Sequence, residues 1–244
     1  MDDVRISADP SGYIMVLPVP EMVAQIQTNM ASTLNIDWLL GLGADLIKEM
    51  GGTVSHADLV ARIEGWLAHT QPGEVIYHPY ISEAGERGPF IDTNARAGFA
   101  GLGSKHGFPD LLRAVIEGLG YAARDCYDAM GGVPGEVRLT GGAARSAKLR
   151  GILSAALNAS VCTASREEAG AAGAAMTAAV AIGAYTDMKD CIADWVQPFL
   201  GPSEAPDAAL AARYSSLFPT YRTMREEAGP IWANLAAIKE THHA

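Results

Sequence analysis

The residues best suited to hold a ligand lie in a strand-to-helix turn with two adjacent glycines. The turn reads Leu139-Thr140-Gly141-Gly142-Ala143-Ala144-Arg145-Ser146. Gly141 and Gly142 allow a sharp backbone bend and let a ligand approach without contact from a Cβ atom. Ser146 is a typical N-cap, and a helix that starts there presents free N–H groups and a partial positive charge. The turn therefore suits the ribose and phosphates of a nucleotide, although turns of this kind also occur with no ligand.

A second group of chemically active side chains lies in the segment from Pro79 to Gly107, which is rich in Gly, Pro and Asn. A long loop inside a compact domain is uncommon and often functional. Glu86, Arg87, Asp92 and Arg96 bring both signs of charge into this loop. We expect them to form an ion-pair network that fixes the loop, in preference to direct contact with a substrate.

A third segment, from Ala169 to Thr186, is rich in alanine and glycine and contains no charged residue. Small side chains three and four residues apart let a helix lie close to another backbone. We therefore predict a buried helix from Glu167 to about Gly183. The segment lacks the density of Leu, Ile and Val that a membrane-spanning helix requires.

The order of the remaining elements favours an α/β fold. From Pro109 onward the pattern alternates helix, strand, helix, strand and helix, which is typical of strands covered by helices. We expect a helical tail from Ala208 to Lys239, with breaks at Pro219 and Pro230. The other predicted helices are 55–69, 109–130 and 146–157, with helical patterning over 22–50, and the predicted strands are 13–19, 75–77, 136–140 and 160–163.

Composition limits the classes of partner. The chain has 244 residues and a formal net charge of -10, which argues against nucleic acid or an anionic membrane as the main partner. Its cysteines, Cys126, Cys162 and Cys191, form no CxxC pair, so we expect a reduced, cytoplasmic compartment. No His-x-x-x-His pair is present, and we assign no metal ligands.

Several of these segments together resemble a known family. The run Ala97-Gly98-Phe99-Ala100-Gly101-Leu102 is followed after seven residues by the capped helix that begins Asp110-Leu111-Leu112-Arg113. With Gly85-Glu86-Arg87 upstream, this pattern resembles the second signature of the FGGY carbohydrate kinases, which are ATP-dependent sugar and polyol kinases. Within the family, the sequence of residues 28–37 and of the long loop is most similar to the erythritol and xylulose kinase branches. The resemblance implies an actin-like ATPase (ribonuclease H-like) domain, with a mixed sheet flanked by helices.

The resemblance also implies roles for individual residues. Gly141, Gly142 and Ala143 match the turn that lines the ATP site of the family, and Ser146 occupies a position whose side chain lies near the nucleotide. Thr33 stands where many members have a glycine beside the ATP phosphates, and at this position it would offer its hydroxyl. The alanine-rich segment matches one that supports the adenine pocket. The implied cofactors are ATP and Mg²⁺.

Other parts of such a kinase have no counterpart in this sequence. The family's general base, its Gly-Thr phosphate loop and most of its sugar contacts precede the region that matches. We therefore interpret residues 1–244 as the C-terminal nucleotide-binding domain, with the sugar or polyol bound through an absent N-terminal domain. Asp37, Asp92 and Asp110 match structural positions, so no catalytic residue is assigned.

Two further functions remain open. The chain could be a non-catalytic interaction module that pairs with a separate N-terminal chain, and a homodimer is a related possibility, since a face without its partner would expose apolar surface. A dinucleotide-binding oxidoreductase ranks far lower, because the Gly-x-Gly-x-x-Gly spacing and the acid about 20 residues beyond it are absent.

Overall fold

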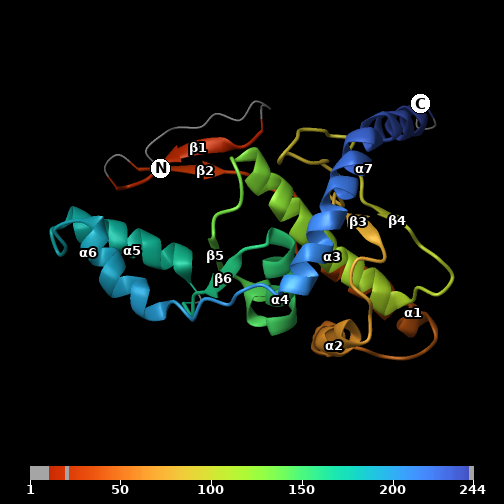
Figure 1. Ribbon diagram of the computed structural model, residues 1–244, viewed down its shortest axis with the longest axis horizontal. Helices are drawn as coiled ribbons and strands as arrows, with labels where there is room; N and C mark the ends of the chain where they lie inside the picture. Colours follow the sequence, from red (N-terminus) through yellow and green to blue (C-terminus); the bar gives the residue numbers. More distant parts are fainter. Residues whose placement is uncertain (1–10, 20–21, 167, 242–244) are drawn as a thin grey trace.

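Helices dominate the computed structural model, which describes residues 11–19, 22–166 and 168–241. A long helix, α3, passes through the middle of the molecule, and α7 crosses it (Figure 1). The strands are β1 (Tyr13–Val16), β2 (Val23–Ile26), β3 (Ile76–His78), β4 (Gly98–Ala100), β5 (Glu136–Leu139) and β6 (Ser160–Thr163). The helices are α1 (Leu34–Glu49), α2 (His56–Ala68), α3 (Phe108–Ala129), α4 (Ala147–Leu157), α5 (Ala169–Ala181), α6 (Met188–Trp195) and α7 (Ala208–Thr241), with short 3-10 turns η1 (Gly142–Arg145) and η2 (Gln197–Phe199).

The strands of the described residues form three separate two-stranded sheets. The β1–β2 and β3–β4 pairs are antiparallel, whereas β5 and β6 are parallel and are joined through α4. A parallel pair needs such a crossover, because the chain must return to the same end before the next strand begins. The prediction of an α/β fold agrees with this arrangement, but the strands do not join into the single mixed sheet that was expected.

The hydrophobic core lies between α3 and the elements around it. Helices α1, α2, α4 and α7 and strand β3 each contribute buried side chains to one cluster. Because α3 is buried along most of its length, it positions the elements on both sides of it. The largest buried members of this cluster include Leu40, Leu67, Tyr77, Leu112, Val115, Tyr121, Tyr214 and Tyr221.

Helix starts predicted from capping residues are confirmed. Ser55 and Asp58 form a capping box at the start of α2, in which each side chain accepts a hydrogen bond from the other residue's backbone N–H. Asp110 accepts a hydrogen bond from the Gly107 N–H at the start of α3, at 2.8 Å. Ser146 caps α4 as expected. These contacts are local in sequence, which is why the residue types alone were sufficient to predict them.

Two helix boundaries were predicted wrongly. The segment from Met22 to about Thr33 is not helical, because Val23–Ile26 pairs with β1 and α1 begins only at Leu34. The expected breaks in the C-terminal tail are also absent, since α7 continues through Pro219 and Pro230. Each proline removes one N–H donor, whereas the buried aromatic side chains of α7 hold this helix against the core.

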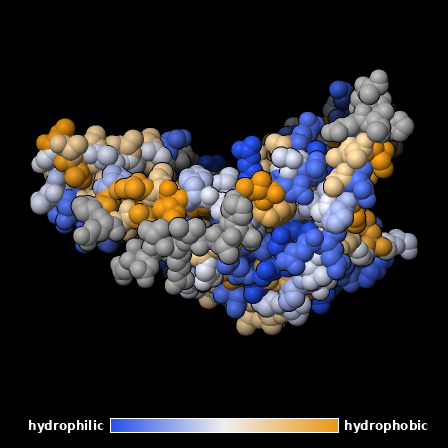
Figure 2. All heavy atoms as spheres, turned by 90° about the horizontal axis from the view of Figure 1, so that it is seen from above, coloured by the Kyte–Doolittle hydropathy of each residue, from blue (hydrophilic) through white to orange (hydrophobic). Residues whose placement is uncertain are grey.

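The alanine-rich helix is also placed differently from the prediction. Helix α5 is mostly exposed, and Met176 is its buried residue. Together with α6 it forms an arm that extends away from α3 and α7 (Figure 1), and hydrophobic residues gather over this end of the molecule (Figure 2). An alanine face buries little area, so it does not by itself specify a partner surface. Glu167, where the helix was expected to begin, lies outside the described residues.

The expected ion-pair network in the loop is wrong as well. The buried carboxylate of Glu86 accepts hydrogen bonds from the backbone N–H groups of Met30 at 2.8 Å, Arg87 at 2.8 Å and Gly88 at 3.4 Å. Asp92 accepts one from the Asn94 N–H, and Arg96 donates to nearby backbone carbonyls. The loop is therefore fixed, as expected, but by hydrogen bonds between charged side chains and the backbone.

Candidate functional site

The glycine turn has the geometry that the sequence predicted. Gly141 lies two residues beyond the end of β5 and has a φ of 88°, a left-handed conformation that favours glycine, and a Cβ added there would meet open space. Gly142 and Ala143 follow directly and begin η1. Ser146 then starts α4, and its hydroxyl oxygen accepts a hydrogen bond from the Leu149 N–H at 3.4 Å. The backbone thus turns sharply and leads into a helix N-terminus within six residues.

Thr33 and Ser146, which lie far apart in the sequence, border the same cavity. This cavity has a volume of about 580 Å³ and lies between the start of α1, the side of α2 and the start of α4. We call it the large cavity. The Thr33 side chain forms no capping hydrogen bond with α1, so that role does not occupy its hydroxyl. The residues lining the large cavity are Thr33, Ile36, Asp37, Val60, Ala61, Ile63, Glu64, Arg145, Ser146 and Leu149.

Two carboxylates give the large cavity a polar wall. The Ser146 hydroxyl donates a hydrogen bond to Glu64 Oε1 at 2.8 Å, and this contact joins α4 to α2. Asp37 lies 2.9 Å from His56 Nε2 across the gap between α1 and α2. Both contacts are exposed, so the carboxylate oxygens remain accessible to a ligand. Oxygens of this kind accept hydrogen bonds from hydroxyl or amino groups.

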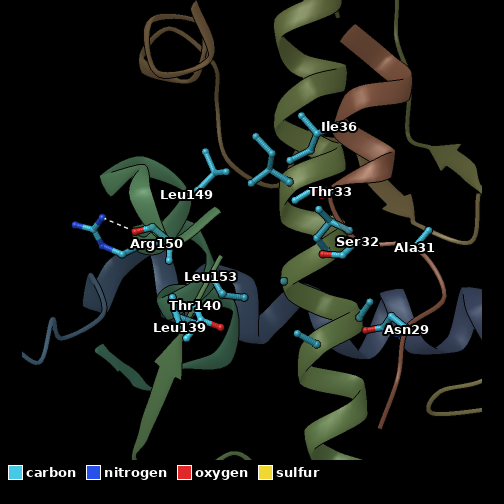
Figure 3. A pocket seen from close by; sticks show the side chains of 16 residues that line it. Asn29, Ala31, Ser32, Thr33, Ile36, Leu139, Thr140, Leu149, Arg150 and Leu153 are labelled. Carbon is cyan, nitrogen blue, oxygen red and sulfur yellow. Dashed lines mark hydrogen bonds between the residues drawn. The ribbon is translucent and has the colours of Figure 1, made fainter. Parts of the chain in front are cut away.

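A second, mostly apolar cavity adjoins the first at Thr33. It has a volume of about 230 Å³ and lies between α3, the start of α1, the end of β5 and α4 (Figure 3). Leu139, Leu149 and Leu153 line it from one side, whereas Ser32 and Ile36 line it from the other. Thr33 therefore lines both cavities.

The turn itself separates the large cavity from a third one. Gly141 borders a polar cavity of about 410 Å³ that is also lined by Arg145, Arg150 and Arg166. Of the predicted binding residues, the structure thus brings Thr33 and Ser146 together and places Gly141 on the opposite side of the turn. Arg145 borders both spaces.

A buried asparagine positions Thr33, and sequence reasoning missed it. Asn35 donates hydrogen bonds to the carbonyls of Ala31 at 3.2 Å and Ser32 at 3.1 Å, and it accepts one from the Tyr77 hydroxyl at 2.9 Å. Tyr77 is in β3, so this contact ties the start of α1 to the central elements. The available sequence signal was a polar residue on the apolar face of a helix.

The three aspartates that were set aside as bases occupy distinct places. Asp92 and Asp110 hold local turns through backbone hydrogen bonds, as expected of structural residues. Asp37 differs, because it lines the large cavity. Glu64, which was not singled out from the sequence, borders the same cavity. Within the described residues there is no group of three or more His, Cys, Asp or Glu side chains arranged to hold a metal ion.

Comparison with known proteins decides the family. The C-terminal domain of the FGGY family of carbohydrate kinases matches residues 10–182. The chain belongs to this family. It is 58% identical over 237 residues to an erythritol kinase from Brucella abortus (strain 2308), and that match covers 97% of the chain and 46% of the relative. It is 34% identical to a xylulose kinase from Escherichia coli (strain K12), over 65% of the chain and 33% of the relative.

Solved structures of FGGY kinases have the same fold. The chain superimposes on the ligand-bound xylulose kinase from Lactobacillus acidophilus with a TM-score of 0.78 at 23% identity, covering 96% of the chain and 45% of that protein. A gluconate kinase from the same species gives a TM-score of 0.77 at 22% identity, over 96% of the chain and 45% of that protein. The chain thus spans less than half the length of these relatives. Because they are kinases, the comparisons do not favour a non-catalytic interaction module.

No helix among the described residues is both long enough and apolar enough to span a membrane.

Proposed function

We propose that this chain is the ATP-binding half of a polyol kinase, and that the large cavity holds the nucleotide. The observation that carries the proposal is the meeting of Thr33 and Ser146 in one cavity beside the glycine turn. Family resemblance gave these two residues a nucleotide role from sequence alone. Their shared cavity supports that role, because a single ligand at this place would reach both side chains.

The residues of the cavity fit an adenine nucleotide. A volume of about 580 Å³ lies within the usual range for small-molecule sites. The carboxylates of Asp37 and Glu64 provide acceptors for the ribose hydroxyls or the adenine amino group, and Ile36, Val60 and Leu149 provide apolar contacts. Ser146 places the N-terminus of α4 at this cavity, where backbone N–H groups and the helix dipole favour phosphate oxygens. Mg²⁺ usually binds through the phosphates, water and one or two carboxylates.

The role of this chain in the reaction would be to bind and orient the phosphate donor. Bound ATP supplies the γ-phosphoryl group, and catalysis of such transfers depends on alignment and on stabilisation of charge. Thr33 and Ser146 would hold the nucleotide on the α1 and α4 sides of the cavity. The base that activates the hydroxyl, and most contacts with the polyol, would come from the part of the kinase that this chain does not contain.

The similarity to an erythritol kinase suggests erythritol as the acceptor, with transfer to one of its hydroxyl groups. The proposal includes the actin-like ATPase arrangement, in which two domains close around a cleft. It also includes a cytoplasmic location, where ATP is available. The whole activity is tested by co-expressing the chain with the unmatched part of the Brucella abortus kinase and assaying erythritol phosphorylation. Formation of erythritol phosphate supports the acceptor, whereas a soluble complex that phosphorylates xylulose instead contradicts it.

A pair of matched substitutions in α2 tests the site. Ala61 is exposed and borders the large cavity, whereas Ala68 is exposed at the end of the same helix, outside the cavity lining. Ala61→Trp should fill part of the space and raise the dissociation constant for Mg–ADP by about tenfold or more, which corresponds to about 1.4 kcal/mol. Ala68→Trp should leave it unchanged. Isothermal titration measures both.

Two results of the titration would contradict the proposal. A folded wild-type chain that binds neither Mg–ATP nor Mg–ADP at millimolar concentration has no autonomous nucleotide site. Equal affinities in the wild type and the Ala61→Trp variant would place the nucleotide elsewhere.

A further inference from the structure

The guanidinium group of Arg150 connects the glycine turn to a distant segment of the chain. Arg150 lies in α4, one turn after Ser146. Its Nη1 donates to the carbonyl oxygen of Ala144 at 2.9 Å and to that of Arg145 at 3.3 Å. Its Nε and Nη2 donate to the carboxylate of Glu204, at distances of 2.9 to 3.1 Å. The guanidinium group thus binds the turn through Nη1 and the Glu204 carboxylate through Nε and Nη2.

Glu204 is itself fixed. Its backbone N–H donates to the Val161 carbonyl at 2.7 Å and its carbonyl accepts from the Val161 N–H at 2.9 Å, so it lies against the outer edge of β6. The Arg150 side chain is mostly enclosed, with 17% of its surface exposed, compared with 40% for Glu204. A bidentate pair of this kind is geometrically specific, because both groups are planar. The edge of β6 therefore sets the position of the guanidinium.

The hydrogen bonds from Arg150 to the carbonyls of Ala144 and Arg145 fix the direction of the peptide groups in the turn. In a trans peptide, the carbonyl of one residue and the N–H of the next point in opposite directions. With the carbonyls of Ala144 and Arg145 directed at Arg150, the N–H groups of Arg145 and Ser146 are directed away from it. Ser146 borders the large cavity, whereas Arg150 borders the two neighbouring cavities. The guanidinium and the proposed nucleotide are therefore on different sides of the turn.

We propose that Arg150 is a positioning residue of the nucleotide site, and that Glu204 holds it in place. This inference rests on the proposed function. Arg150 acts through the backbone of the turn, whose conformation it selects before the nucleotide arrives. Without it, Gly141 and Gly142 would give the turn access to other conformations, and binding would have to restrict them again.

The test compares the affinity for Mg–ADP with thermal stability in four variants. Arg150→Ala should raise the dissociation constant by about tenfold, the expected size of a lost charged hydrogen bond. Arg150→Lys should retain part of the affinity, because a lysine cannot hold both edges together. Glu204→Gln should give an intermediate loss. If Arg150→Ala does not fold, Arg150→Lys and Glu204→Gln still allow the affinity for Mg–ADP to be compared with thermal stability.

The matched control is Arg124, a partly buried arginine on α3. It also donates to a carbonyl of α4, that of Ala156, but at the opposite end of the helix from the turn. Arg124→Ala should lower the melting temperature and leave the dissociation constant unchanged. If the Arg150 variants behave in the same way, Arg150 is a stability residue only and the inference is wrong.

A measurement without nucleotide separates this inference from the proposed function. Hydrogen exchange of residues 141–146 in the free protein should be faster in Arg150→Ala than in the wild type, and unchanged in Arg124→Ala. If the wild type binds no nucleotide, the proposed function fails, and unchanged exchange in Arg150→Ala would independently overturn the positioning of the turn. If the wild type binds and Arg150→Ala binds equally well, only the present inference fails.

Discussion

At the scale of single residues, Glu86 links the long loop to the candidate site. Its carboxylate accepts the N–H of Met30, and the nearby Asn29 side chain donates to the carbonyl of Gly88 at 2.9 Å. These contacts hold the segment that leads directly to Thr33. A buried charge without an ion pair is costly, so the hydrogen bonds to the backbone are what make the position tolerable.

The protonation of Glu86 should make stability depend on pH. Burial raises the pKa of Glu86 above its usual value, and the three backbone hydrogen bonds oppose that shift. The folded state then binds a proton more tightly than the unfolded state does. Its contribution to stability is therefore fully present below the unfolded pKa of 4.5 and is lost as the pH rises through the folded pKa.

We expect the free energy of unfolding to fall by more in the wild type than in Glu86→Gln as the pH rises above 4.5, because glutamine does not titrate. Urea denaturation of both proteins at several pH values across this window measures the difference. Parallel curves would show that Glu86 keeps an ordinary pKa in the folded protein. Burial also raises the pKa of Glu117 and Asp125, so part of the slope should remain in the variant.

At the scale of elements, glycines decide how closely α3 approaches its neighbours. A Cβ at Gly118 would lie 2.3 Å from the carbonyl oxygen of Tyr77 in β3, and one at Gly120 would lie 2.7 Å from the Cβ of Ala156 in α4. Backbone atoms cannot move aside as a flexible side chain does. The close contact of α3 with β3 therefore requires a residue without a side chain at position 118. Close packing at Gly118 and Gly120 also explains why two glycines, which are poor helix formers, occur within a long helix.

Two glycine-to-alanine substitutions should have opposite effects. Gly118→Ala should destabilise the protein by about 1–3 kcal/mol, because the added methyl group overlaps the backbone of β3. Gly65→Ala in α2 meets open space and should stabilise the protein by about 0.4–1 kcal/mol through a smaller entropy loss on folding. Chemical denaturation measures both changes. Equal signs for the two variants would contradict the close approach of α3 and β3.

At the scale of the whole molecule, the β1–β2 hairpin presents an exposed apolar strand. All four side chains of β1, Tyr13, Ile14, Met15 and Val16, are exposed although they are apolar. A two-stranded hairpin is marginally stable alone, and an exposed apolar edge strand favours association. The chain spans less than half the length of its relatives.

We predict that the isolated chain associates with itself as its concentration rises, and that β1 contributes to this contact. Val16→Lys should shift sedimentation toward the monomer, because a charge on the edge strand opposes pairing. Met50→Lys is the matched control, since Met50 is 81% exposed and Val16 80% exposed, but Met50 lies at the end of α1. A monomeric wild type, or equal effects of both substitutions, would remove β1 from the interface.

The amino-acid sequence alone determined the features that depend on neighbours within a few residues. The caps at Ser55, Asp110 and Ser146, the left-handed bend at Gly141 and the family signature all follow from local residue types, because hydrogen bonds across three or four residues are specified by those residues. The roles of Thr33 and Ser146 were predicted through the resemblance.

Only the tertiary structure decided which distant residues share a cavity. Three features depend on how the helices are placed against α3. Asp37 and Glu64 line the large cavity, Gly141 is separated from it, and Arg150 contacts Glu204. The exposure of α5 was decided in the same way, because an alanine-rich helix is compatible with burial and with solvent. The conformational entropy lost on folding is offset by burial of apolar surface between segments that are distant in sequence. Which of these segments meet cannot be read from any one short segment.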